Sequence, residues 1–92
     1  MSNFTKAPES RLDYAVDWTP FIQGTEGDAI ASADWVDVTE GLVVEDPQLI
    51  ESVHAAFFSG GEPGRAYRAT SRITTEQGRV DDRTITIYVR RT

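Results

Sequence analysis

The sequence predicts an all-β fold, a small antiparallel β-sandwich formed by a single domain of 92 residues. Apolar and polar side chains alternate with a period of two along the stretch 66–89, which is also rich in β-branched and aromatic residues. Turn-forming residues recur roughly every ten positions along the rest of the chain, with short strand candidates between them. Together these observations favour short strands arranged in two packed layers.

The stretch 66–89 is expected to form one long hairpin. A three-residue turn at Glu76-Gln77-Gly78 keeps the apolar positions of both arms on one face, whereas a two-residue turn would mix the faces. Gly78 then occupies the last turn position, where left-handed backbone is required. This register pairs Tyr67 with Ile87, Ala69 with Ile85, Thr70 with Thr84, Arg72 with Asp82 and Thr75 with Arg79.

The first eleven residues are polar and show no period, so they predict a flexible N-terminal arm, residues 1–11, ahead of a sandwich domain, residues 12–92. The alternating segment from Leu12 to Trp18 predicts a first strand, which Thr19-Pro20 breaks. Residues 21–24 are too few for a stable helix and are expected to form one turn, ended by Gly24.

Three further strands are expected in the middle of the chain. Residues 30–38 predict a strand with a bulge near Asp34, because the apolar positions change parity there. Residues 42–45 predict a short strand that ends at Asp46-Pro47. The run 49–58 also fits a helical stripe, but a strand over 51–58 is preferred because the run is short and its neighbours are strands.

Charge is divided unevenly along the chain. The net charge is −6, with 11 acidic and 2 basic residues up to Gly60 but 4 acidic and 7 basic residues from Gly61 onward. Direct nucleic-acid binding is not expected, because phosphate contacts need a basic surface. The division suits copies that pack acidic face against arginine face, although charge that only keeps the surface soluble explains it too.

Composition argues against several kinds of reactive site. The chain has no cysteine, which excludes disulfides and thiolate chemistry. His54 is the only histidine and is expected at the surface or edge of a strand, so no catalytic, cofactor-binding or metal-binding residue is predicted. Acidic pairs such as Asp81-Asp82 leave calcium binding by a loop as an open alternative. No apolar run reaches membrane length, and no membrane partner is expected.

Glycines and tryptophans have structural explanations. The run 60–64 is rich in glycine but is not a phosphate cradle, because neither Lys-Ser/Thr nor a helix follows it; it predicts a turn with positive φ angles. Trp35 is expected in the core between the sheets. The position of Trp18 is open, because it borders the Thr19-Pro20 break and could anchor an interface instead.

Four motifs follow one another in a recognisable order. They are Asp17-Trp18, the downstream Trp35, the run Ser59-Gly60-Gly61-x-x-Gly64-x-x-Tyr67 and the run Ile73-Thr74-Thr75-x-x-Gly78-Arg79. In this order the chain resembles the small proteins of tailed bacteriophages known as fibre–tail adaptors. The resemblance extends from about Leu12 to Val89 and departs at Phe57, where tryptophan is expected in the family.

The resemblance implies an immunoglobulin-like β-sandwich and a non-enzymatic structural component of the virion, assembled in the host cytoplasm. Such a protein is expected at the neck, tail or fibre attachment. Its partners would be copies of itself, in a ring or symmetric array, and other virion proteins such as portal, adaptor, tail or fibre subunits. No cofactor is expected.

The interface hypothesis names an aromatic in the arm, an exposed tryptophan and residues of the long hairpin: Phe4, Trp18, Arg68, Arg72 and Tyr88. The arm and one strand edge or loop set would engage neighbouring subunits, with the arginines meeting acidic patches. The alternatives are a carbohydrate- or receptor-binding module that uses Trp18 and Tyr14 as a stacking platform, a capsid decoration protein and a small hydrolase dependent on His54.

Overall fold

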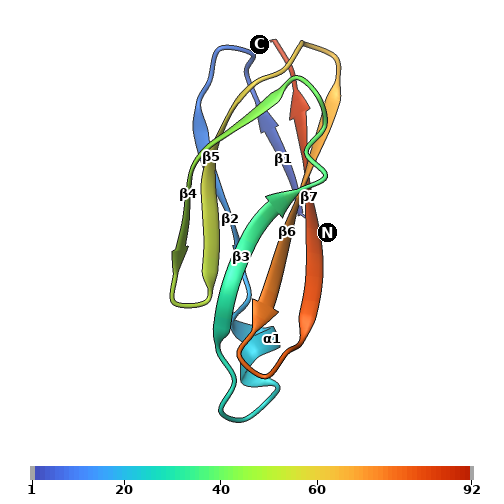
Figure 1. Cartoon of the computed structure of the whole chain (residues 1–92). Coiled ribbons are helices and arrows are strands. Elements are labelled where there is room, and N and C mark those ends of the chain that lie inside the picture. The colour runs from blue at the N-terminus through green and yellow to red at the C-terminus, as the bar shows by residue number, and fades with distance from the viewer. Residues whose placement is uncertain (1, 92) are drawn as a thin grey trace.

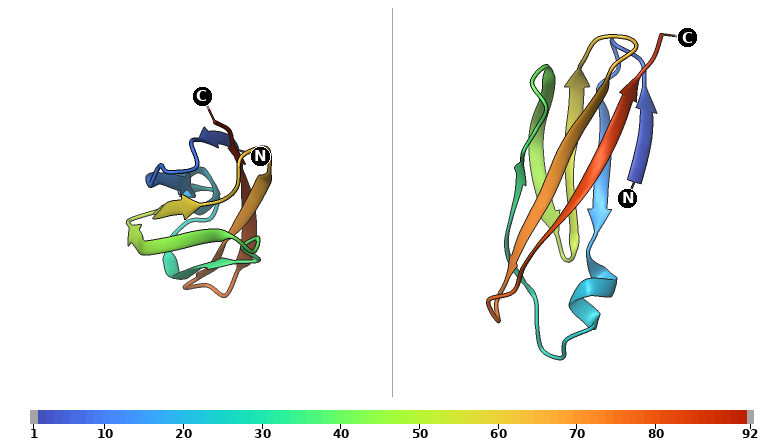
Figure 2. Two further views of the ribbon diagram at one scale, coloured as in Figure 1. Left: turned by 90° about the horizontal axis from the view of Figure 1, so that it is seen from above. Right: turned by 90° about the vertical axis from the view of Figure 1, so that its right-hand side faces the viewer.

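A computed structural model describes residues 2–91 as two packed β-sheets with one short helix (Figure 1). The elements are β1 (Ser2–Lys6), β2 (Leu12–Asp17), α1 (Thr19–Gln23), β3 (Ile30–Val36), β4 (Leu42–Ile50), β5 (Val53–Gly60), β6 (Ala66–Thr75) and β7 (Val80–Val89). Sheet A has the strand order β1-β7-β6-β3, and sheet B has the order β2-β5-β4. The two layers face each other along a body of 45 × 22 × 18 Å (Figure 2). The predicted all-β sandwich is confirmed.

The long hairpin has the predicted register. Tyr67 lies opposite Ile87, and Arg72 lies opposite Asp82. The three-residue turn closes through the Thr75 N–H, which donates to the Arg79 carbonyl at 2.8 Å, and Gly78 adopts the left-handed φ of +88°. The side chains that point inward from the hairpin are almost completely buried: Tyr67, Ala69, Ile73, Ile85, Ile87 and Val89. Each large apolar side chain among them stabilises the fold by about 1.5–3 kcal/mol relative to exposure.

The N-terminal segment is part of sheet A. Residues 2–6, which the sequence predicts as a flexible arm, form β1 and pair in parallel with β7, so that Lys6 lies opposite Val89. The other strand pairs are antiparallel, and one parallel pair therefore departs from the expected purely antiparallel arrangement. This strand is hard to recognise from the sequence, because Phe4 is its only large apolar residue.

Two expectations about strand irregularities are wrong in detail. The bulge in β3 lies between Ile30 and Ser32 and not near Asp34. Strand β4 does not end at Asp46-Pro47 but continues to Ile50. The register of its pairing with β5 shifts between Glu45 and Gln48, so the chain bulges at Asp46-Pro47 and the pairing then resumes. Asp46 takes a positive φ of 48° in this bulge, where Pro47, which has no N–H, does not break the sheet.

Residues 49 and 50 of the ambiguous run 49–58 belong to β4, and the remainder contains a strand, as preferred. It forms β5, which begins at Val53 after a turn at Glu51 and Ser52 and extends to Gly60. The expected single turn after β2 is helix α1, which carries Pro20 in its first turn, where the missing N–H costs nothing. Gly24 ends this helix with φ −68°, so it does not use left-handed backbone. Within residues 2–91 no helix is long and apolar enough to cross a membrane.

A chain of aromatic contacts joins the two sheets. The ring of Phe4 on β1 stacks on Tyr14 of β2 with centroids 4.3 Å apart, and Tyr14 contacts Phe58 of β5 at 5.8 Å. Phe58 then meets the edge of Trp35 on β3 at 5.1 Å. Trp35 is half-buried against the core, where the sequence placed it. These rings fill the sandwich at both open sides.

Candidate interaction surfaces

A buried cluster of three hydrogen-bonded side chains links the two sheets in the core. The Trp18 Nε1–H donates to Ser71 Oγ at 3.0 Å, and Ser71 Oγ lies 2.6 Å from His54 Nδ1. All three side chains are buried, with exposed fractions of 0%, 0% and 1% for Trp18, Ser71 and His54. The expectation that His54 lies at the surface or edge is wrong. It occupies the central strand of sheet B and has the same inward parity as Ala56 and Phe58, a signal already present in the sequence.

The buried histidine is held neutral. Burial lowers the pKa of His54, and the nearby charge of Asp34 only partly opposes this effect. The imidazole also stacks on the Trp35 ring, with centroids 4.5 Å apart. Because neither His54 nor Ser71 reaches the surface, this pair cannot act on a substrate in the folded protein. The hydrolase alternative dependent on His54 therefore has no accessible site.

The glycine run 60–64 forms the site in which the Tyr67 side chain packs, called the seat of Tyr67. The Gly61 N–H donates to the Gly41 carbonyl at 3.1 Å, and the hydroxyl of Tyr67 accepts the Glu62 N–H at 2.8 Å. A Cβ on Gly61 would lie 2.7 Å from Val89 Cγ2 and 3.0 Å from Tyr67 Cε2, so no larger residue fits. The expected turn with positive φ angles is confirmed.

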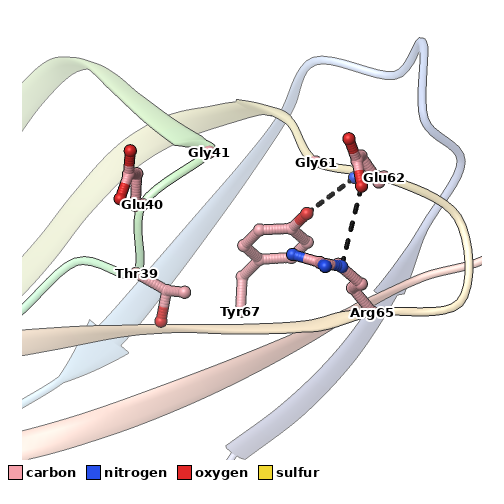
Figure 3. Close-up of a pocket in the computed structure, with 7 residues that line it drawn as sticks. All are labelled: Thr39, Glu40, Gly41, Gly61, Glu62, Arg65 and Tyr67. Carbon is pink, nitrogen blue, oxygen red and sulfur yellow. Dashed lines mark hydrogen bonds and ion pairs between the residues drawn. The ribbon is translucent and has the colours of Figure 1, made fainter.

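This seat borders a shallow hollow of about 650 Å³ (Figure 3). Arg65 and Glu62, which Figure 3 shows at the rim of this hollow, form an ion pair in which Arg65 Nε lies 3.6 Å from the Glu62 carboxylate. Across residues 2–91, no group of three or more His, Asp or Glu side chains is placed to hold a metal ion. The calcium alternative therefore has no ligand cluster in the described residues.

The turn that contains Gly78 and Arg79 binds the loop between α1 and β3 through Asp28. The Asp28 carboxylate, whose side chain is fully buried, accepts hydrogen bonds from Arg79 Nε at 2.9 Å and from the Gln77 N–H at 3.1 Å. Burial raises the pKa of Asp28, but these hydrogen bonds outweigh it and hold the pKa below its usual range. The Arg79 guanidinium also lies 4.3 Å from the centroid of the Phe21 ring.

Three of the five hypothesised interface residues share the outer face of sheet A. Arg68 and Arg72 on β6 and Tyr88 on β7 alternate with the buried hairpin residues and point to solvent. Arg72 is held in place by a bidentate pair with Asp82 at 2.7 and 2.9 Å. Arg68 has no ion pair within the described residues.

The other two hypothesised residues are not on that face. Trp18 is buried in the core and cannot contact a partner, because its ring is needed between the sheets and its Nε1–H is satisfied by Ser71. Phe4 is half-buried against Tyr14. A stacking platform of Trp18 and Tyr14 for carbohydrate therefore does not exist at the surface.

The outer face of sheet B, called face B below, has a different character. An apolar strip of outward-pointing residues runs along it, comprising Val43, Ile50, Val53, Ala55 and Phe57. Carboxylates border the strip on both sides: Asp13 and Asp17 on β2, and Glu45 and Asp46 on β4. Arg11 lies 4.1 Å from the Phe57 ring centroid and pairs with both Glu45 and Asp46. The sequence did not reveal this face, because Asp46-Pro47 was expected to end the strand.

Two of the four edge strands, β3 and β4, are less suited to pairing with another chain. The outer edge of β4 is interrupted by a bulge that contains Pro47, and the outer edge of β3 is interrupted by a bulge after Ile30. Bulges, proline and charge at an edge oppose the addition of a further strand. These two edges are therefore less suited to contacts with another chain than the two outer faces are.

Residues 6–88 match the protein family described as podophage GP4 fiber-tail adaptor protein gp77. The chain belongs to this family. A search of curated proteins gives no match. Membership of the adaptor family identifies a structural protein of a phage particle, as the sequence resemblance implied. The matched span contains the four motifs, and the structure gives each a packing role: Trp18 and Trp35 in the sandwich, the glycine run around Tyr67, and Arg79 on Asp28.

Proposed function

We propose that this chain is a non-enzymatic connector at the neck, tail or fibre attachment of the virion. In this role it packs against copies of itself, in a ring or symmetric array, and against portal, tail or fibre subunits. The observation that carries the proposal is the contrast between two broad outer faces, one acidic and apolar and the other bearing arginines, on a body whose polar core groups are sealed from solvent. Many weak contacts of this kind add up in a multivalent particle.

We also propose that the sandwich is immunoglobulin-like. Its strand order, with β2-β5-β4 in one layer and β7-β6-β3 in the other, fits the seven-stranded immunoglobulin arrangement. Trp35 on the third strand supports this assignment, as does the Tyr67 hydroxyl bonded to the backbone of Glu62 at the start of β6. Where antibody domains have a disulfide between the second and sixth strands, this cysteine-free chain has the hydrogen bond from Trp18 to Ser71.

A reconstruction of the particle tests the connector function directly. We expect the chain at a symmetric position between the tail and its fibres or the neck, in contact with other virion proteins. Its absence from purified particles would refute the function, and copies spread over the capsid surface would favour the decoration alternative. Binding of the isolated protein on a glycan array would favour the carbohydrate alternative.

The role of the first eleven residues is a separate part of the proposal. Their removal takes away β1 and uncovers the edge of β7, so we expect the truncated protein to fold but to be lost from particles. Cooperative thermal unfolding of the truncated protein would check the fold, and immunoblotting of purified particles would check incorporation. Normal incorporation would refute a role of this segment in assembly.

A further inference from the structure

The end of sheet A where β7 finishes carries a cluster of exposed arginines. We call Arg65, Arg68, Tyr88 and Arg90 the arginine patch. Arg68 and Tyr88 occupy successive outward rows of the hairpin, opposite Thr86 and Ala66 respectively. Arg65, Tyr88 and Arg90 line a hollow of about 380 Å³, and the Arg90 guanidinium lies 5.8 Å from the Tyr88 ring centroid. The only carboxylate paired with the patch in the described residues is Glu62, at 3.6 Å from Arg65.

Face B has the opposite charge and an apolar centre, which Arg11 covers only at Phe57. Its border holds four carboxylates against one arginine, and Asp13 has no ion pair within the described residues. Ile50 and Val43 are 63% and 47% exposed. An apolar centre with a charged rim is the usual anatomy of a protein interface. Such a face fits a partner that combines positive charge with an aromatic or apolar contact, and the arginine patch of this same chain provides both.

We propose that face B binds the arginine patch of a second copy of this chain. The proposal rests on the self-packing part of the proposed function and names the two surfaces involved. Opposite charges on the two surfaces orient the copies, and Tyr88 faces the apolar strip.

The geometry makes this contact head-to-tail. Face B and the arginine patch lie on opposite sheets and point away from each other, so one copy uses different surfaces towards its two neighbours. Such a heterologous contact continues from copy to copy, and it closes into a ring when the rotation between copies divides a full turn. An isologous dimer, by contrast, would use the same surface on both copies and stop at two.

Two variants of the full chain separate these arrangements. The first variant, Val43→Arg with Ile50→Arg, places positive charge on face B and leaves the arginine patch intact. The second variant, Arg68→Glu with Tyr88→Ser, alters the arginine patch and leaves face B intact. Glu76→Arg, at the exposed turn between β6 and β7, is the matched control for a charge change outside both surfaces.

Sedimentation velocity over a range of protein concentrations gives the result. We expect the parent chain and the Glu76→Arg control to associate into species larger than dimers, and each double variant to remain monomeric. An equimolar mixture of the two double variants is expected to form a dimer and nothing larger, because only one intact pair of surfaces remains. A parent chain that stays monomeric, a double variant that still associates, or a mixture that stays monomeric would each overturn the proposal.

Incorporation into particles distinguishes this proposal from the connector function. If both double variants enter particles at the position of the parent chain, the head-to-tail contact is wrong while the connector function stands. If the parent chain itself is missing from particles, the connector function is wrong. Circular dichroism of each variant verifies that loss of association does not come from loss of the fold.

Discussion

The two long hairpins of the sandwich behave differently although each joins neighbouring strands of one sheet. The β6–β7 hairpin keeps one uninterrupted register from Ala66 and Tyr88 to Thr74 and Val80. The β4–β5 hairpin shifts register between Glu45 and Gln48, and its inward-pointing Leu49 is still 38% exposed. The comparison indicates that burial against the opposite sheet keeps the strand register regular in the β6–β7 hairpin. The less buried end of the β4–β5 hairpin tolerates a register shift and exposed apolar side chains.

The largest expected contrast compares one isoleucine from each hairpin. Ile85→Ala in β7 should destabilise the protein by about 2–5 kcal/mol, because the side chain is completely buried and its removal leaves a cavity. Ile50→Ala in β4 should change stability by less than about 0.5 kcal/mol, because that side chain is mostly exposed. Urea unfolding followed by tryptophan fluorescence measures both values, and equal losses would contradict the distinction between the hairpins.

Two glycines in the loop before β6 allow a second comparison, between a crowded and an open position. Gly61→Ala should cost about 2–4 kcal/mol, because the new Cβ would overlap Val89 and Tyr67 and the backbone has φ +92°. Gly64→Ala should cost only about 1 kcal/mol, since its φ is also positive but nothing lies within 4 Å of the new Cβ. Thermal unfolding of both variants checks the difference, and similar midpoints would show that the seat of Tyr67 tolerates crowding.

Ser71→Ala tests the polar link between the two sheets. The substitution leaves the Trp18 N–H and the His54 ring nitrogen without their shared partner, which should cost about 1–3 kcal/mol. Thr84→Ala is the control, because it removes the Thr70–Thr84 hydrogen bond of the same hairpin, which lies on the outer face and is only partly buried. If the control costs as much as Ser71→Ala in urea unfolding, the buried link has no special role.

The smallest expected effect depends on pH. The folded protein lowers the pKa of His54, so the unfolded chain binds a proton more readily than the folded chain does. The contribution of neutral His54 to the free energy of unfolding is complete above the unfolded pKa of about 6.5. It is lost as the pH falls below that value, and the free energy of unfolding then decreases by at most about 1.4 kcal/mol per pH unit. We expect the stability of the parent to fall more steeply than that of His54→Gln between pH 7 and 5. Parallel slopes in urea unfolding would refute a neutral buried His54.

Sequence reasoning succeeded where one physical rule dominated. The period of two and Gly78 together determine the register of the β6–β7 hairpin, because a slip by one residue would expose its apolar set. Local sequence patterns did not predict contacts between distant parts of the chain. The parallel pairing of β1 with β7 and the placement of Trp18 beside Ser71 depend on residues far apart in the sequence. Pro47 misled because a bulge can accommodate a residue that a regular ladder rejects.

The candidate surfaces were predictable in part for the same reason. Arg68, Arg72 and Tyr88 fall on one face as soon as the hairpin register is known. Face B needed the continuation of β4 beyond Pro47, which brings Ile50 beside Val53 and completes the apolar strip. Asymmetry of charge along the chain was visible in the sequence, but its division between two sheets was not.

The parallel pairing of β1 with β7 also has a mechanical consequence. Ser2 lies opposite Ile85 and Lys6 opposite Val89, so both strands run in the same direction, side by side. Tension that draws the first strand and the last strand apart along their common axis loads all the hydrogen bonds between them together, in shear, and does not peel them open one at a time. The height of the unfolding barrier, more than the equilibrium stability, then sets how much load a single copy withstands.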